Sequence, residues 1–456
     1  MIHAVSLLAL AMTGCVAVRN DDATPPADSG AGVVADPIGA LRREFRFDSD
    51  SPSIPAGLVA ACGGARVVGL GELSHGTHED ALLKSALALA LIDAGQVDTV
   101  YIEANRTGGE QLDSFLRSEG GDARAAVRDA SIFRVLKTEA FAYLVAGMQE
   151  RVARGRTLRI VGIDCQDSRP DAEFALTRLA ARDAPLAERL RAGLAPILGP
   201  LAAAGDAAAG APAQANLRHP QLIKSLDTAR LHTSIAACRA LRAALAEDTA
   251  AAVAAERAAQ GLLSFEHEVS DGDAAKIDGD YFSRRDRYMA ENILANGPIK
   301  GAFWGHNVHI LGGPRDVMQG YVSSGTILRE ALGRDYRIVV CDYGSARISA
   351  VISQPGSALP DATGAKEIVT RDLLSNGLAA AVTGAKPRSC WLDLASAPSS
   401  VALDAWRAIP REFDWPDYAA PRERNAEQLF PIALGQLVDV IVVLESVGPA
   451  RWLVPD

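Results

Sequence analysis

The chain has 456 residues and a formal net charge of −10 at neutral pH. It is long enough to bury a full core in one large domain or two, and it lacks the basic balance typical of proteins that bind nucleic acid. Hydrophobic residues make up 48% of the chain and charged residues 22%, which indicates a globular protein. After the N-terminus, no segment has about 18 uninterrupted apolar residues, so we expect no transmembrane helix.

Residues 1–15 are predicted to be a bacterial lipoprotein signal. An apolar stretch from Ala4 to Met12 leads into small residues before Cys15, which would carry the lipid. The stretch lacks Lys and Arg, and Met12 stands where Leu is usual, so a cleaved signal or a cytoplasmic protein with another start codon stays open. Residues 16–45 are expected to form a flexible tether. The protein would then lie on the periplasmic side of the cell envelope, touching the membrane only through its anchor.

Five further cysteines lack any CxxC spacing, which argues against a zinc ribbon. We expect them to be buried small residues, and the sequence does not determine their disulfide state. They are Cys62, Cys165, Cys238, Cys341 and Cys390.

Short apolar runs bounded by Gly or polar residues predict strands, and segments of helical period separate the first of them. This alternation predicts an α/β fold with a central, largely parallel sheet flanked by helices, formed by one domain over residues 46–456. The expected strands are Ala65–Leu70, Thr99–Ile102, Leu158–Ile163, Ile299–Trp304, Tyr336–Cys341, Cys390–Leu394 and Val438–Leu444, and the expected helices include Ala81–Ala94 and Phe133–Arg154.

Residues 171–296 interrupt this alternation. They contain no convincing strand and are rich in Ala, Leu, Arg and Glu, so we expect a helical insertion between the third and fourth strands. An insertion at that point would lie over the C-terminal edge of the strands as a lid or a substrate wall. Residues 355–366 are expected to form a surface loop.

Polar side chains follow four of the predicted strands. The first strand ends in Glu72 and His75, the second in Glu103, the third in Asp164, and the fourth leads to His306 and His309. Because ligands of open α/β sheets bind at the carboxyl ends of the strands, we expect these side chains to converge on one edge.

Imidazole and carboxylate groups together suit general acid–base catalysis, in which a neutral His takes a proton from water. The same groups suit a zinc or iron site. Neither HExxH nor GxSxG is present, and Ser74 is adjacent to His75, an unfavourable spacing for a nucleophile–base pair. His78 is a less certain member of the set.

These motifs, in this order, resemble the erythromycin esterase family over about residues 60–450. The resemblance implies an α/β core with helical additions and hydrolysis of an ester or macrolactone without a metal or other cofactor. It rests on Gly71-Glu72-x-x-His75-Gly76-Thr77-x-Glu79, Glu103, Gly162-Ile163-Asp164, Arg285-Asp286-x-x-Met289-Ala290-x-Asn292, Trp304-Gly305-His306-Asn307-x-His309, and the closing strand with Pro449-Ala450.

The resemblance also implies roles for individual residues. His75 would activate water, Glu72 and Glu103 would orient it, and His306 and His309 would assist at the carbonyl. Lys84 stands where some members have Arg, so it lacks the bidentate fork for a carboxylate. The candidates for substrate binding are Lys84, Asp164, Arg285, Asn292 and Asn307.

Two other functions stay open. One is a metal- or haem-binding lipoprotein, or a metalloprotease-like hydrolase, that uses the same His and Glu residues as ligands. The other is a binding scaffold whose site has decayed. The sequence does not identify the small-molecule ester, show whether macrolides or antibiotic resistance are involved, or give the oligomeric state.

Overall fold

A ten-stranded mixed sheet forms the centre of the protein, in the order β1-β8-β12-β6-β2-β5-β3-β4, with β7 and β10 also paired to β6. The computed structural model describes residues 36–206, 226–266, 279–297, 300–314, 317–318, 320–352, 366–414, 419–420, 422–423 and 429–454. The strands from β12 to β4 are parallel, whereas β8 and β7 pair antiparallel to their neighbours. This confirms the predicted α/β fold with a largely parallel sheet.

The predicted strands are all present. Their bounds are β1 Arg43–Glu44, β2 Val67–Glu72, β3 Thr99–Ile102, β4 Arg159–Gly162, β5 Gly301–His306, β6 Tyr336–Ile352, β7 Lys366–Arg371, β8 Cys390–Asp393, β10 Ala419–Ala420 and β12 Val440–Val447; β9 Arg411–Asp414 and β11 Leu429–Ile432 form a separate two-stranded sheet. The expected loop at 355–366 lies outside the described residues except for Lys366, which begins β7.

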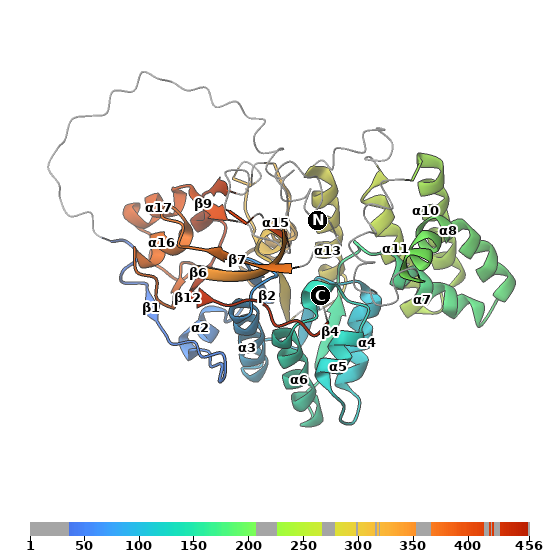
Figure 1. The fold of residues 1–456 in the computed structure, drawn as a ribbon, viewed down its shortest axis with the longest axis horizontal. Coiled ribbons are helices and arrows are strands. Elements are labelled where there is room, and N and C mark those ends of the chain that lie inside the picture. The colour runs from blue at the N-terminus through green and yellow to red at the C-terminus, as the bar shows by residue number, and fades with distance from the viewer. Residues whose placement is uncertain are drawn as a thin grey trace, which may run out of the picture.

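Helices cover both faces of the sheet. The group α3–α6 lies together below the sheet in Figure 1, and α3 packs against α6. On the other face, α14 packs against β2 and β6. The bounds are α2 Ala56–Ala61, α3 Glu79–Asp93, α4 Arg106–Leu116, α5 Ala123–Asp129, α6 Glu139–Ala153, α14 Asn307–Ile310, α15 Ser324–Leu332, α16 Leu378–Thr383 and α17 Val401–Ala408, with short 3₁₀ turns at Arg134–Leu136, Gly333–Asp335 and Leu434–Gln436.

Side-chain caps explain where several of these helices begin. Asn105 accepts from the backbone N–H of Gly108 at the start of α4, and Thr138 accepts from that of Phe141 at the start of α6. Both are residues that commonly satisfy the unpaired donors of a first turn. Because α4 begins directly after β3, its cap fixes the chain just beyond Glu103.

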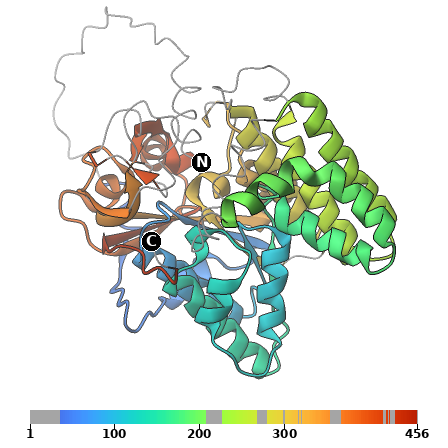
Figure 2. The same ribbon diagram turned by 45° about the vertical axis from the view of Figure 1, so that its right-hand side comes forward.

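The insertion between β4 and β5 is helical in its described residues, as predicted. Most of it forms a bundle on the right of Figures 1 and 2, next to the β4 edge of the sheet, and α11 packs against Cys165 just beyond the end of β4. The last helix, α13, places Arg285 and Asp286 against the strand ends. The helices are α7 Arg169–Ala180, α8 Ala184–Asp206, α10 Thr228–Ala244, α11 Thr249–Leu263 and α13 Gly279–Leu294.

The folded domain begins before residue 46, which corrects the predicted end of the tether. Ile38 is buried, and β1 pairs antiparallel with β8. The predicted signal at residues 1–15 and the tether up to residue 35 lie outside the described residues. Among the described residues, no helix is both long and apolar enough to cross a membrane.

All five cysteines are buried and free, as expected for small apolar residues. Burial raises the pKa of the thiols of Cys62, Cys165 and Cys238 to about 12. They are therefore thiols and not thiolates at neutral pH.

Candidate active site

His75 and Glu72 form a hydrogen-bonded pair at the end of β2. The Nδ1 atom of His75 lies 2.7 Å from Oε1 of Glu72, and both side chains are buried. A carboxylate at this nitrogen fixes the tautomer with the proton on Nδ1, so the lone pair is on Nε2. The pair therefore has the geometry of a general base and the residue that orients it.

Lys84 holds Glu72 from the opposite side. Its Nζ lies 3.0 Å from Oε2 of Glu72, donates to the carbonyl oxygen of Gly305 at 3.1 Å, and stands 4.1 Å from the ring centroid of Trp304. The carboxylate that Lys84 binds is therefore an internal one. This differs from the substrate contact predicted for Lys84.

These contacts keep Glu72 charged. Burial alone would raise the pKa of this carboxyl, but Lys84 and the hydrogen bond from His75 lower it to about 2. Glu72 is thus a carboxylate over the whole range in which a neutral histidine can act as a base.

The site lies at the C-terminal ends of the adjacent parallel strands β2 and β5. The chain leaves β2 toward α3 on one face and leaves β5 toward α14 on the other, an arrangement that opens a ligand crevice in α/β sheets. Gly71 permits this close packing, because a Cβ there would lie 2.0 Å from Oδ1 of Asn307.

The ring of His306 packs against that of His75. Their ring centroids are 5.0 Å apart with an edge-to-face angle of 62°. The Nε2 of His306 donates to the carbonyl oxygen of Leu73 at 2.8 Å, and its Nδ1 accepts weakly from the N–H of Val308 at 3.5 Å. Through these contacts His306 ties the end of β5 to the loop carrying His75.

Arg285 joins the ends of β3 and β4 from helix α13. Its Nε and Nη2 donate to the two oxygens of Asp164 at 2.9 and 2.6 Å, and Nη2 also donates to Glu103 at 2.8 Å. The second oxygen of Glu103 accepts from the backbone N–H of His306 at 3.2 Å. Burial opposes charge on Glu103, yet His309 and Arg285 hold its pKa well below the ordinary value. Arg285 and Asp164, which were predicted to bind substrate, form an ion pair with each other.

His309 is enclosed by acids. Its Nδ1 lies 2.9 Å from Oδ1 of Asp286, and its Nε2 lies 3.3 Å from Glu103. Burial alone would lower the pKa of His309 and the neighbouring Arg285 opposes its charge, but Asp286 and Glu103 raise it to about 10. The two carboxylates thus favour the protonated form of His309, while Nη1 of Arg285, 3.2 Å from its Nε2, opposes it.

Asp286 is in turn fixed by Tyr321 and Ser324. The Tyr321 hydroxyl donates to Oδ2, and the backbone N–H of Ser324 donates to Oδ1 at 2.9 Å. Asp286 belongs to a motif of the sequence but had no predicted role, and Tyr321 and Ser324 were not predicted to lie at the site. The i, i+1 pairing of Arg285 with Asp286 was the available signal for the first. The other two depend on a tertiary contact.

The remaining candidates lie outside this cluster. The side-chain amide of Asn292 donates to the carbonyl oxygen of Ile163 at 2.8 Å, and that of Asn307 donates to Cys341 at 3.0 Å. These are bonds that hold the core together. His78 begins α3, and burial lowers its pKa.

The cluster as a whole carries one more carboxylate than cation. A positive charge that develops on His75 is therefore favoured. The carboxylates are Glu72, Glu103, Asp164 and Asp286, and the cations are Lys84, Arg285 and His309.

The described part of the chain holds no group of three or more His, Cys, Asp or Glu side chains placed to hold a metal ion. The His and Glu residues that the alternative hypothesis would use as ligands contact Lys84, Arg285 and each other.

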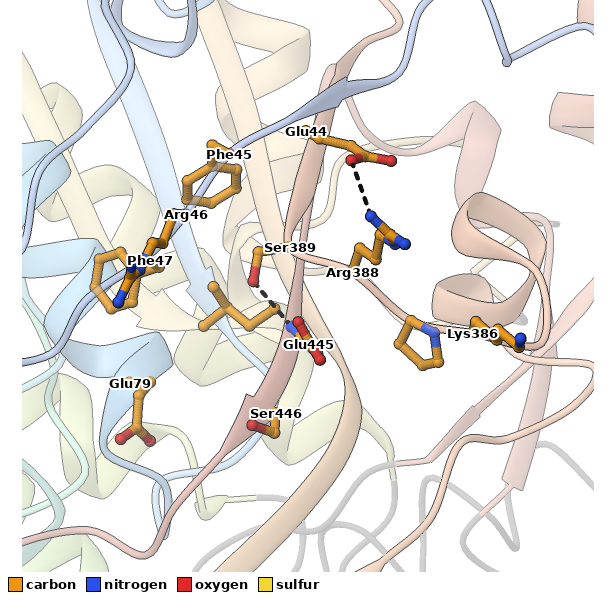
Figure 3. A pocket seen from close by; sticks show the side chains of 12 residues that line it. Glu44, Phe45, Arg46, Phe47, Glu79, Lys386, Arg388, Ser389, Glu445 and Ser446 are labelled. Atoms are coloured by element: carbon orange, nitrogen blue, oxygen red, sulfur yellow. Dashed lines mark hydrogen bonds and ion pairs between the residues drawn. The ribbon is translucent and has the colours of Figure 1, made fainter.

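Two surface pockets lie apart from the cluster. The larger, of about 600 Å³, is lined by residues of both charges, including Arg46, Glu79, Lys386 and Glu445 (Figure 3). The smaller, of about 440 Å³, is lined by His78, Arg124 and Arg451 among others. The larger pocket lies beside β12 and the segment before β8, on the half of the sheet away from β5, β3 and β4.

The chain is similar in fold to three solved structures. A Bacillus cereus protein aligns with a TM-score of 0.70 at 17% identity, over 92% of this chain and 98% of that one. A succinoglycan biosynthesis protein aligns with a TM-score of 0.70 at 14% identity, over 93% and 100%. A histidine-to-asparagine mutant of the erythromycin esterase EreC, in its open conformation, aligns with a TM-score of 0.62 at 20% identity, over 89% and 98%.

A search of curated proteins found no match. The sequence model of the erythromycin esterase family, however, matches residues 92–447, most of the chain. The protein therefore belongs to the erythromycin esterase family and is a hydrolase of that family.

Proposed function

We propose that this hydrolase cleaves a carboxylic ester by general base catalysis from His75. The observation that carries the proposal is the 2.7 Å contact between His75 Nδ1 and a carboxylate that Lys84 keeps ionised. Such a carboxylate holds the imidazole in the tautomer that can accept a proton at Nε2 and stabilises the imidazolium that forms.

The proposed reaction proceeds in two steps. His75 Nε2 takes a proton from water as the water oxygen attacks the ester carbonyl and forms a tetrahedral intermediate. The protonated His75 then gives its proton to the alcohol oxygen as the carbon–oxygen bond breaks, leaving a carboxylic acid that ionises. The imidazolium of His309 and the guanidinium of Arg285 supply positive charge near the developing oxyanion.

Glu103, Asp164, Asp286 and His306 are positioning residues in this proposal. Their contacts with one another and with backbone groups fix the ends of β3, β4 and β5 relative to His75. Preorganised charges of this kind lower the barrier because they need not reorient during the reaction.

A macrolactone is the first substrate to test, since the family includes erythromycin esterases. Purified residues 16–456 would be incubated with erythromycin and with simple esters, and the products measured by mass spectrometry. We expect a mass gain of one water on any hydrolysed lactone. His75→Ala should lower kcat by about 10²–10⁴-fold or more while circular dichroism shows an intact fold. Unchanged turnover in His75→Ala would refute the proposal.

We also propose that the reaction needs no metal. The same assays with a chelator, and metal analysis of the purified protein, test this directly. Loss of turnover with the chelator together with one equivalent of bound transition metal would favour the metalloenzyme alternative.

The proposed location is the periplasmic side of the bacterial envelope, through lipidation at Cys15. Metabolic labelling with a fatty acid should label the full chain but not Cys15→Ser. Equal labelling of both would refute an anchor at this residue.

A further inference from the structure

Arg257, on helix α11 of the insertion, is a buried guanidinium without a carboxylate partner in the described part of the chain. Its side chain donates from Nη1 to the amide oxygen of Gln260 at 3.2 Å, while its Nε has no hydrogen-bond partner there. The residue is only 7% exposed. Because a guanidinium stays protonated in proteins, burying it without an anion is costly.

Arg106 lies in the same region and also has an unused donor. It is the first residue of α4, is 8% exposed, and its Nη1 has no partner among the described residues. Its Nη2 contacts Glu110, and its guanidinium lies 5.5 Å from the ring centroid of Phe174. Two buried arginines near Asp171 thus have N–H groups without a hydrogen-bond partner among the described residues.

The one buried carboxylate beside them is already engaged. Asp171 accepts from the backbone N–H groups of Arg106 and Thr107, at 3.3 and 2.7 Å, and from the Thr107 hydroxyl at 2.5 Å. The Asp171 carboxylate interacts electrostatically with both arginines. Glu110 and Asp171 equal the two arginines in number, but neither forms an ion pair with Arg257, so an additional anion could accept from the unused N–H groups of Arg257 and Arg106.

This cluster is connected to the catalytic groups. Gln260, which receives the Arg257 bond, also accepts from Asn292 at 3.2 Å, and Asn292 donates to the carbonyl of Ile163, the residue before Asp164. Arg106 follows β3 three residues after Glu103. The two arginines thus border the C-terminal ends of β3 and β4, on the same edge of the sheet as His75.

We propose that Arg106 and Arg257 form an anion subsite, and that the preferred ester of this enzyme carries a carboxylate or phosphate group bound there. This inference rests on the proposed ester hydrolysis at His75. The strand order β2-β5-β3-β4, with neighbours about 4.8 Å apart, places the anionic group roughly 10–15 Å from the ester carbonyl. Erythromycin, which has a tertiary amine and no anionic group, would leave the subsite unfilled.

A matched pair of chromogenic esters tests the substrate class. Mono-4-nitrophenyl sebacate carries a carboxylate at the far end of its chain, and 4-nitrophenyl decanoate is its neutral counterpart. We expect the wild type to prefer the sebacate in kcat/KM, and Arg257→Gln to lower kcat/KM for the sebacate by about 10- to 100-fold, mainly through KM, with little effect on the decanoate. Arg239→Gln, an exposed arginine on α10 of the same insertion, makes the same change in net charge and should leave the preference intact.

Calorimetric titration with inorganic phosphate and with acetate gives a readout that does not depend on turnover. We expect binding to the wild type that is lost in Arg257→Gln, and the tighter of the two ions identifies phosphate or carboxylate as the natural group. Equal losses for both esters in Arg257→Gln, or no anion binding with equal rates for both esters, would overturn the subsite. Anion binding that depends on Arg257 without hydrolysis of either ester would instead refute the proposed function and leave the subsite standing.

Discussion

Lys84 and Glu72 form a buried ion pair, with 3.0 Å between Nζ and Oε2, and the other oxygen of Glu72 contacts Nδ1 of His75 at 2.7 Å. The pair joins α3, the helix after the loop that carries His75, to β2, the strand before that loop. Since the ionised state of Glu72 depends on Lys84, this contact links helix packing to the state of the catalytic base.

Replacing Lys84 with Met should move the acid limb of the pH–rate profile to higher pH. Without the cation, burial would raise the pKa of Glu72 from about 2, and a protonated Glu72 no longer stabilises the imidazolium of His75. Removing one partner of a buried pair costs about 3–5 kcal/mol of stability. The measurements are kcat/KM from pH 4 to 9 and the free energy of unfolding by denaturant.

The sign of the effect on stability follows from the lowered pKa of Glu72. The contribution of the pair is present above the ordinary carboxyl value of 4.5 and is lost as pH falls toward about 2. Lys84→Arg keeps the charge and serves as the control, and it should retain the wild-type acid limb. An unshifted limb in Lys84→Met would show that Lys84 does not control Glu72.

Replacing Asp286 with Asn should make the free energy of unfolding less dependent on pH between 6.5 and about 10. Asp286 and Glu103 raise the pKa of His309 from 6.5 to about 10, so the stability from this charge is fully present below pH 6.5 and is lost as pH rises to about 10. The wild type should therefore lose stability steadily over that interval, and Asp286→Asn should lose less. Thermal unfolding at several pH values measures both, with the exposed Asp129→Asn as the control. Parallel curves for wild type and Asp286→Asn would contradict the assignment.

The sequence predicted the strands and the acids at their ends because those features are local. Glu72, Glu103 and Asp164 each follow an apolar run, and parallel strands bring such positions together regardless of detail. The extension of β6 to Ile352 was missed because Asp342, Gly344 and Arg347 break the apolar run. Its pairing with the polar strand β7 is a tertiary property.

The partners of the site residues could not be predicted in the same way. Arg285 and Asp286 lie more than a hundred residues after Asp164, on a helix whose docking depends on the whole insertion. Although the two residues are adjacent in sequence, Arg285 contacts Asp164, whereas Asp286 contacts His309. The family resemblance identified the segment. Only the fold shows that Arg285 forms an ion pair with Asp164 and that Asp286 raises the pKa of His309.

Glu103→Gln should reduce kcat less than His75→Ala does. Glu103 contacts Arg285, His309 and the backbone of His306, and its influence on His75 is electrostatic. We expect a loss of about 10-fold in kcat, below the 10²–10⁴-fold expected for the base. Steady-state kinetics of both single variants and the double variant measure the coupling, with the exposed Glu119→Gln as a control. Equal single losses that do not add would instead make Glu103 and His75 one catalytic unit.

Gly71→Ala should destabilise the protein and distort the site together. A Cβ at this position would lie 2.0 Å from Oδ1 of Asn307 and 2.7 Å from Cδ1 of Ile310, so either β2 or α14 must move. Overpacking of this kind costs about 1–3 kcal/mol. Because Glu72 follows directly, a shift of β2 would also lengthen its contact with His75 and lower kcat.

Gly448→Ala is the matched control, since its Cβ would meet the nearest atom, Oε2 of Glu79, at an ordinary 3.5 Å. It should cost well under 1 kcal/mol and leave kcat unchanged. Denaturant unfolding and steady-state kinetics of the two variants separate packing from chemistry. If Gly71→Ala lost stability but kept full kcat, the strain would be absorbed by α14, and the position of Glu72 would not depend on the packing of β2 against that helix.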